Sequence, residues 1–248
     1  MRVAAISDIH GNLPALEAVL EEIDREGPDL IISCGDVASG PMPAETIDRL
    51  MTLRDVRFVR GNADDGLIDE FDGAAPPPLP GPFADWCAKQ INRRHRDFLA
   101  SFEDTITVDD VDGVGRVLFC HATPKNNLDI LTMETPAERV QELFGDVDAD
   151  LVVCGHTHMQ FDRKVGRLRV VNAGSIGMPY GKPGAYWAML GPDVHLRRTD
   201  YDRQAAARRI RAKDWPQAEE FATKNVLTVP SVDEAFEFFR KAQARLAS

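Results

Sequence analysis

The sequence predicts an α/β fold, because short apolar runs of strand length alternate with amphipathic patterns of helical period. Five runs are short enough for strands, namely residues 3–6, 30–34, 57–59, 117–120 and 151–154. A chain of 248 residues with 44% hydrophobic content can bury one substantial core. We therefore expect one domain, or one domain with an appendage.

The first predicted helix follows the first strand. Leu13, Leu16 and Leu20 recur at helical spacing, with Asn12 as the expected N-cap. This helix would begin beside His10, and free N–H groups at a helix amino end favour an anion. Gly11 and Asn12 are therefore candidate phosphate contacts, although Asn12 can act as a simple cap.

Each predicted strand is followed by polar residues. The five motifs are Asp8-Ile9-His10, Gly35-Asp36, Gly61-Asn62-Ala63-Asp64, His121 and Gly155-His156-Thr157-His158. Residues two apart project from the same side of an extended chain, so each D-x-H or H-x-H pair can point two ligands into one cleft. Ligand sites of open α/β sheets gather at the carboxyl ends of strands. We expect these five ends to form one site.

The ligand types in these motifs indicate a metal. Carboxylate, imidazole and carboxamide groups suit divalent Mn, Fe, Co, Ni or Zn, and the motifs contain no thiolate. The motifs supply enough ligands for two ions. The alternative is that Asp8 and Asp36 cap turns, while the histidines are ordinary polar residues at strand ends.

The ordered set D-x-H, G-D, G-N-x-D, H and G-H-x-H resembles the calcineurin-like metallophosphoesterase superfamily. Asn172-Ala173-Gly174-Ser175 also looks like the N-x-G-S segment of that family. The chain is most similar to its compact bacterial and archaeal phosphodiesterase branch, in a longer form with a helical insert. The resemblance implies a four-layer α/β/β/α sandwich, in which two central mixed sheets are flanked by helices.

The resemblance also implies two metal positions. Asp8, His10 and His158 would hold one divalent ion, Asn62, His121 and His156 the other, and Asp36 would bridge them. Phosphoesters would then be hydrolysed by in-line attack of a metal-bridging hydroxide, through which Asp36, Asn62 and His121 would act. Asp64 would hydrogen-bond a metal ligand and so orient it; the alternative is that Asp64 is simply a turn residue.

One departure from the family pattern concerns the substrate. Ala63 stands where many phosphomonoesterases of the superfamily have a histidine that aids leaving-group protonation. This favours phosphodiesters or (di)nucleoside polyphosphates. The alternatives are a phosphomonoesterase or protein phosphatase, and a metal-bound interaction scaffold without turnover, as in the retromer subunit with this fold. His95 and His195 are expected at the surface, where either could still supply an acid.

The remaining segments predict the outline of the chain. Residues 1–200 would form the phosphoesterase domain, with a proline-rich connection at 73–82 and a helical insert at 83–102. Arg93, Arg94 and Arg96 of the insert either gather phosphates or form a solvated face. Lys125 is a candidate substrate contact. Residues 201–248 would form a helical extension packed on the core or on a second subunit, so a homo-oligomer is possible.

Composition limits the partners. The formal charge of −11 and the lack of an aromatic and basic platform argue against stable nucleic-acid binding, but a nucleotide remains a possible substrate. The four cysteines form no C-x-x-C pair and are expected as reduced thiols, three of them in the core. No run is long enough to span a bilayer, and no secretory signal is recognisable. A cytoplasmic enzyme is expected.

Overall fold

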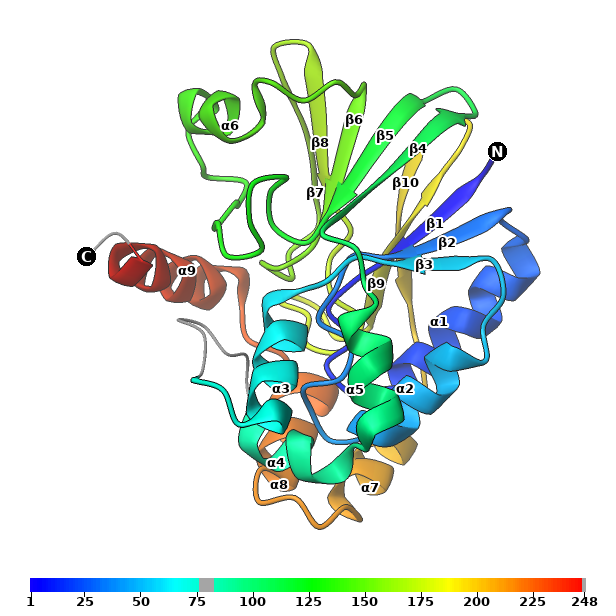
Figure 1. Cartoon of the computed structure of the whole chain (residues 1–248), viewed down its shortest axis with the longest axis vertical. Coiled ribbons are helices and arrows are strands. Elements are labelled where there is room, and N and C mark those ends of the chain that lie inside the picture. The colour runs from blue at the N-terminus through cyan, green and yellow to red at the C-terminus, as the bar shows by residue number, and fades with distance from the viewer. Residues whose placement is uncertain (76–82, 247–248) are drawn as a thin grey trace.

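Two five-stranded sheets form the centre of the structure, a computed structural model that describes residues 1–75 and 83–246 (Figure 1). The first sheet has the order β10-β9-β1-β2-β3 and consists of β1 (Val3–Ile6), β2 (Leu30–Ser33), β3 (Val56–Phe58), β9 (Ala185–Leu190) and β10 (Val194–Thr199). The second has the order β4-β5-β6-β8-β7 and consists of β4 (Thr105–Val111), β5 (Gly115–Cys120), β6 (Leu151–Cys154), β7 (Phe161–Val165) and β8 (Leu168–Asn172).

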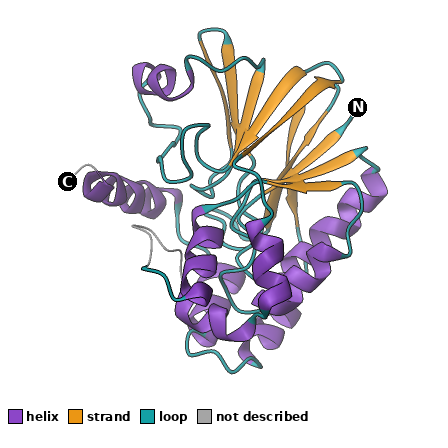
Figure 2. Cartoon of the chain, viewed as in Figure 1, coloured by secondary structure: helices purple, strands orange, loops and turns teal. Residues whose placement is uncertain are grey.

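The sheets pack face to face, and helices cover their outer faces (Figure 2). Val3 and Ala5 of β1 face the second sheet, whereas Ala4 and Ile6 face the helices, as the two-residue period of a strand requires. The first sheet is covered by α1 (Leu13–Glu26), α2 (Pro43–Met51), α3 (Asn62–Asp72), α4 (Ala84–Gln90) and α5 (Arg93–Ala100). The second is covered by α6 (Ala137–Phe144). The predicted α/β/β/α sandwich is confirmed.

The five predicted strands are β1, β2, β3, β5 and β6. Parallel pairing joins β1 to β2, β2 to β3 and β5 to β6, so their carboxyl ends share a direction within each sheet. The motifs thus come from two facing sheets and not from a single one, and in Figure 1 the strands of both sheets converge toward the middle of the molecule. The other five strands were not predicted, and three of them, β4, β7 and β10, lie at the sheet edges.

Helix α1 begins as predicted, because the Asn12 side chain accepts a hydrogen bond from the Ala15 N–H at 3.4 Å. The predicted insert is two helices, α4 and α5. Asn92 separates them by capping α5, accepting from the His95 N–H at 3.1 Å. The predicted proline-rich segment lies mostly at residues 76–82, outside the described residues.

The arginines of the insert form a paired surface. Arg96 pairs with Asp72, and Arg93 pairs with Asp97 at 3.1 Å. This favours the solvated-face interpretation over phosphate gathering, because these guanidinium groups already have carboxylate partners. His95 is also not at the surface as predicted. It is buried, and its Nε2 lies 3.1 Å from Asp48 Oδ1 on α2.

The C-terminal segment is helical as predicted. It contains α7 (Arg203–Arg211), α8 (Ala218–Phe221), a π-helix (Ala222–Leu227) and α9 (Val232–Leu246). A capping box starts α9, since Glu234 and Ser231 bond to each other's backbone N–H groups. One face of α9, with Ala235 and Phe239, packs against Ile130 and Met159 of the same chain. The boundary at residue 200 and the homo-oligomer stay predictions.

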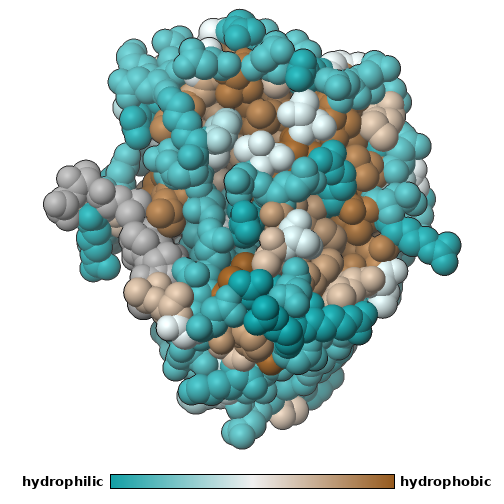
Figure 3. Space-filling view, in the orientation of Figure 1, coloured by the Kyte–Doolittle hydropathy of each residue, from teal (hydrophilic) through white to brown (hydrophobic). Residues whose placement is uncertain are grey.

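The four cysteines are free and buried, which confirms them as core residues. In the upper half of Figure 3, where Figure 1 shows the two sheets, hydrophobic residues gather at the surface, while most of the remaining surface in this view is hydrophilic. Within the part of the chain that the structure describes, no helix is both long and apolar enough to cross a membrane.

Phe119 tests the packing between the sheets. It is fully buried there, so Phe119→Ala should lower the free energy of unfolding by about 3 to 5 kcal/mol. Phe238 on α9 is 59% exposed, and Phe238→Ala should cost less than about 0.5 kcal/mol. Urea denaturation of both variants measures the difference. Equal losses would contradict the assigned core.

Candidate metal centre

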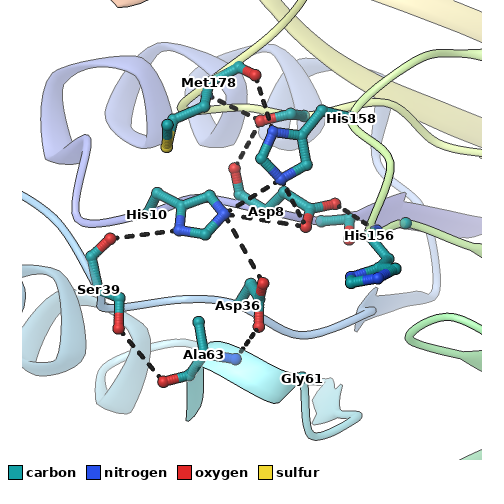
Figure 4. Close-up of polar contacts among 12 residues, drawn as sticks. Asp8, His10, Asp36, Ser39, Gly61, Ala63, His156, His158 and Met178 are labelled. Carbon is teal, nitrogen blue, oxygen red and sulfur yellow. Dashed lines mark hydrogen bonds and ion pairs between the residues drawn. The ribbon is translucent and has the colours of Figure 1, made fainter. Parts of the chain in front are cut away.

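The structure brings six predicted ligands together in two groups. Within each group the ligand atoms lie within 4.8 Å of one another, and the groups are Asp8, His10 and His158, and Asp36, His121 and His156. Figure 4 labels all of these residues except His121. All six follow strands β1, β2, β5 and β6, so both sheets contribute to each group. The strand ends converge as the sequence predicts.

Asp36 lies between the two groups. Its Oδ2 is 3.7 Å from His10 Nε2 and 3.4 Å from His121 Nε2. Its Oδ1 accepts the backbone N–H of Ala63 at 2.8 Å, which fixes the rotation of the carboxylate. Asn62 belongs to the His121 side, since Asn62 Oδ1 is 3.1 Å from His121 Nε2. One carboxylate therefore faces both groups.

Backbone carbonyl groups orient three of the imidazole rings. The Nδ1 atoms lie 3.2, 2.7 and 2.9 Å from carbonyl oxygens, in the pairs His10 with Ser39, His121 with Cys34 and His158 with Met178. An N–H donated to a carbonyl on one side of the ring leaves Nε2 as the atom available to a metal. A sequence pattern cannot reveal these partners, because the contacts are made by main-chain atoms.

Most of the ligands have an unusual backbone conformation. Positive φ angles of 46° to 66° occur at Asp8, His10, Asp36, His156 and His158. Non-glycine residues in this left-handed region cost about 1 to 3 kcal/mol each and persist only where the surroundings hold them. Such strain gathers at functional sites, so five strained ligands in one place support a functional role for the site.

Two motif glycines allow the loops to approach closely. A Cβ on Gly61 would lie 2.1 Å from Asp36 Oδ1, and a Cβ on Gly155 would lie 1.9 Å from Ser7 Oγ. Both contacts are far shorter than atoms tolerate. Only glycine therefore fits at these two positions, where the glycine backbone of one loop packs against a side chain of another.

Asp64 supports the turn that carries Asp36. Its carboxylate accepts the backbone N–H groups of Asp36 and Gly61 at 2.9 Å and of Val37 at 3.0 Å. Burial, and then the Asp36 charge, raise the pKa of Asp64 to about 7. Asp64 contacts the main chain and no ligand side chain in these bonds, so we propose that it positions Asp36 through the backbone.

The N-x-G-S segment supports the other loops. The Asn172 side chain donates to the carbonyl of Gly155 and, at 3.1 Å, to Thr157 Oγ1, beside His156. The Ser175 hydroxyl donates to the carbonyl of Asp8 at 2.8 Å. The sequence singled out this segment but gave it no role. In the structure it ties the β6 loop and the β1 loop to the end of β8.

The residues of the site fit divalent metal ions. Asp8 Oδ1 is buried and has no hydrogen-bond partner among the described residues, while His158 Nε2 lies 3.2 Å away. A buried carboxylate oxygen is costly without a partner, and a cation held between the carboxylate and imidazole atoms would supply one. All the donors are oxygen or nitrogen atoms, as borderline and hard metals prefer.

The comparison with protein families agrees with this geometry. The model of the calcineurin-like phosphoesterase superfamily domain matches residues 1–193. The chain belongs to this superfamily. The predicted family is thereby confirmed, and the protein is a phosphoester hydrolase of a metal-dependent family.

Individual relatives cover most of the chain. An uncharacterized protein of Methanocaldococcus jannaschii, MJ0912, is 29% identical over 241 residues, which cover 86% of this chain and 94% of the relative. Phosphodiesterase YfcE of Escherichia coli is 28% identical over 207 residues, covering 78% and 89%. The crystal structure of a metallophosphoesterase from Sphaerobacter thermophilus has a TM-score of 0.70 at 26% identity, covering 92% of this chain and 98% of that one.

A cavity of about 300 Å³ opens beside His121. Apart from Pro124, its other lining residues are polar, namely Arg60, Asp65, Asp104, Thr123, Lys125, Asn126 and Asn127. The predicted substrate contact Lys125 therefore lies near the candidate metal centre, although its Nζ donates to the Glu142 carbonyl at 2.7 Å. Arg60 was not predicted to line the site. In the sequence, only its position directly before Gly61 could have indicated it. It pairs with Asp65 and Asp104.

Gly11 and Asn12 do not support the predicted phosphate contact. Both are buried, and their N–H groups donate to the carbonyls of Val37 and Ile9, each at 3.0 Å. The Asn12 side chain also donates to Gly177. Their backbone donors are already bonded within the protein, so the capping role of Asn12 is the one that the geometry favours.

Burial and neighbouring charges shift the pKa values of the ligands in opposite directions. Burial favours neutral His121, but the adjacent Asp36 carboxylate outweighs it and raises the pKa of His121 to about 10. Burial opposes ionisation of Asp36, yet the same contact lowers its pKa. Burial and the charge of His121 lower the pKa of His156 to about 3. The metal-free site thus contains an imidazolium and carboxylate pair.

Metal binding should therefore release about one proton at pH 8, because His121 must lose its proton to become a ligand. Apparent metal affinity should rise with pH up to the His121 pKa of about 10. Calorimetric titration of Mn²⁺ in two buffers of different ionisation enthalpy measures the release. Identical heats in the two buffers would contradict a protonated His121.

Asp64→Asn should weaken metal binding by about 10- to 100-fold, because an amide replaces one accepting oxygen with a donor that faces backbone N–H groups. Metal titration followed by elemental analysis measures the change, and circular dichroism checks the fold. Asp69→Asn, on the same helix, is the matched control and should bind metal like the wild type. Unchanged affinity in Asp64→Asn would remove its positioning role.

Proposed function

We propose that this protein is a dinuclear-metal-dependent phosphodiesterase. The observation that carries the proposal is the Asp36 carboxylate, which faces two ligand groups at 3.7 and 3.4 Å. Asp8, His10 and His158 would hold one divalent ion, and Asn62, His121 and His156 the other. Asp36 would be shared. The metals would be Mn, Fe, Zn, Ni or Co, since the ligands are oxygen and nitrogen atoms.

The residues of the site would bind and orient the phosphoryl group. When bound, two divalent ions supply a water of lowered pKa and stabilise charge on phosphorus. Asp8 and Asp36 return two negative charges against the four positive charges of the ions, which leaves about plus two at the site before water is counted. This local charge would attract a phosphoester although the chain has a formal charge of −11.

The substrate class follows from the absence of an acid at Ala63. Ala63 is fully buried and contributes a backbone N–H to Asp36, so it has no proton to give a leaving group. His95 is bonded to Asp48 away from the ligand groups, and His195 is exposed on β10. A diester or polyphosphate with a good leaving group depends least on such an acid. The name of the relative YfcE, a phosphodiesterase, agrees with this choice.

The polar cavity beside His121 would receive part of the substrate. Lys125 lines it and is a cation that can bond phosphate or sugar oxygens. Arg60 also lines it, but its guanidinium group is already paired with Asp65 and Asp104. We infer that Lys125 exchanges its bond to the Glu142 carbonyl for a substrate oxygen. A phosphoester small molecule or nucleotide is the expected ligand, and a cytoplasmic location remains our prediction.

The proposal is tested by comparing bis-p-nitrophenyl phosphate with p-nitrophenyl phosphate, using metal-stripped protein resupplied with Mn²⁺, Ni²⁺, Co²⁺, Zn²⁺ or Mg²⁺. The diester should be hydrolysed faster if the site takes phosphodiesters, and since both substrates release the same p-nitrophenolate, leaving-group protonation does not bias the comparison. Release of p-nitrophenolate measures both rates. Asp36→Ala removes the shared ligand and should lower turnover by about 100-fold or more and reduce the metal content to fewer than two ions.

Other outcomes of this experiment would favour other functions. A monoester preference would replace the proposal with a phosphomonoesterase or protein phosphatase. Absence of turnover with every metal, in protein that binds two ions, would favour an interaction scaffold. Full activity and full metal content in Asp36→Ala would contradict the dinuclear site itself.

A further inference from the structure

A second cavity, apolar in character, lies on the other side of the candidate metal centre. Its volume is about 300 Å³, and it is lined mainly by Met133, Met159, Phe161, Tyr180, Tyr186 and Phe236. The wall thus combines a loop before α6, the start of β7, the loop before β9 and helix α9. In Figure 1, α9 lies apart from the helices that cover the first sheet, beside these loops.

This apolar cavity adjoins the metal centre. Met159 directly follows His158, and the ring centroid of Tyr180 lies 6.0 Å from that of His158. Tyr180 also contacts Phe239 of α9, with ring centroids 6.1 Å apart. Tyr180 therefore joins the wall of the cavity to a predicted metal ligand, so a ligand held on phosphorus could extend one arm into the cavity.

Two of the polar groups in the wall are already bonded. Gln160 Nε2 donates to the carbonyls of Ala173, Trp187 and Arg197. The Tyr186 hydroxyl donates to the carbonyl of Lys182 at 2.9 Å. Apart from the Tyr180 hydroxyl and the Gln160 side-chain oxygen, the rest of the wall is carbon and sulfur surface. Methionine sulfur contacts aromatic rings favourably. The wall suits an aromatic ring better than a sugar or a charged group.

The size and rim of the cavity agree with such an occupant. An engineered apolar cavity of ~150 Å³ binds benzene, so about 300 Å³ admits one ring or a fused pair. At the rim, the side chains of Met133 and Val232 are 52% and 43% exposed. Exposed apolar residues around an apolar hollow are typical of a ligand site.

We propose that this cavity, formed in part by α9, is the subsite for an aromatic arm of the phosphodiester substrate. The inference rests on the proposed function, since it assigns one ester arm of that substrate. The other arm would face the polar cavity of Arg60 and Lys125 on the His121 side. The preferred substrate would then be an unsymmetrical diester with one aryl or nucleobase group and one polar group.

The test uses two phosphonates that are not hydrolysed, phenylphosphonate and methylphosphonate, as competitive inhibitors of bis-p-nitrophenyl phosphate hydrolysis by the metal-loaded enzyme. Phenylphosphonate should bind about tenfold more tightly, because its ring fills an apolar pocket. Phe236→Ala should abolish this preference and leave methylphosphonate inhibition unchanged. Phe238→Ala, the same substitution two residues away on the exposed face of α9, should keep the preference.

A second variant and a second readout keep the test independent of folding and turnover. Val232→Gln places a polar group at the exposed rim and should also weaken phenylphosphonate alone. Binding of both phosphonates by calorimetry gives the same ratio without hydrolysis, so a protein that fails to turn over any diester still tests the subsite. Loss of turnover contradicts the function, whereas loss of the ratio contradicts only the subsite.

Two results would overturn the inference. One is equal affinity for the two phosphonates in the wild type, or a phenyl preference that Phe236→Ala leaves intact. The other is sedimentation showing a dimer that Phe236→Ala dissociates, without any phenyl preference, since the apolar surface would then be covered by a second copy of the chain.

Discussion

The geometry of the site depends on the position of the Asp36 carboxylate. One oxygen is fixed by the Ala63 N–H, and the other faces imidazole nitrogens of His10 and His121 from different sheets. The backbone of Asp36 is itself held by Asp64 in a left-handed conformation. This turn therefore helps to align the two ligand groups, together with the direct bond from the His156 backbone N–H to Asp8 Oδ2 at 3.0 Å.

The strained backbone and the buried charges of the site indicate that it is assembled before a metal binds. Five ligands adopt left-handed backbone angles, and Asp8 Oδ1 is buried without a hydrogen bond among the described residues. The protein tolerates this arrangement because Asp64, Asn172 and Ser175 bond to the ligand loops. Without metal, the proton on His121 balances part of the negative charge. A metal ion therefore replaces a proton in a site that is already assembled, which favours binding without a large rearrangement.

The sequence predicted five of the ten described strands, and the ligands that follow them, because that information is local. Each strand is an apolar run, and each ligand follows one directly, as Asp8 follows β1 and His121 follows β5. The division of the ligands between two ions came from the family resemblance. The contacts of the Ser39 and Met178 carbonyls with the histidine rings could not be predicted, because main-chain atoms make them and the residue types do not indicate them. Burial of His95 was missed because it depends on how α5 packs on α2.

The two cavities differ from the ligand site in how the chain builds them. The ligands sit at strand ends in the middle of both sheets, where a change would disturb the core. The apolar cavity instead takes Phe236 from α9 and Met133 from a loop, and the polar cavity takes Lys125 from another loop. Loops and terminal helices change at low cost to folding. The superfamily model matches residues 1–193, so α9 lies outside the matched region. The part of the apolar wall that α9 supplies therefore lies outside it too. Substrate preference can therefore vary while the metal chemistry stays constant.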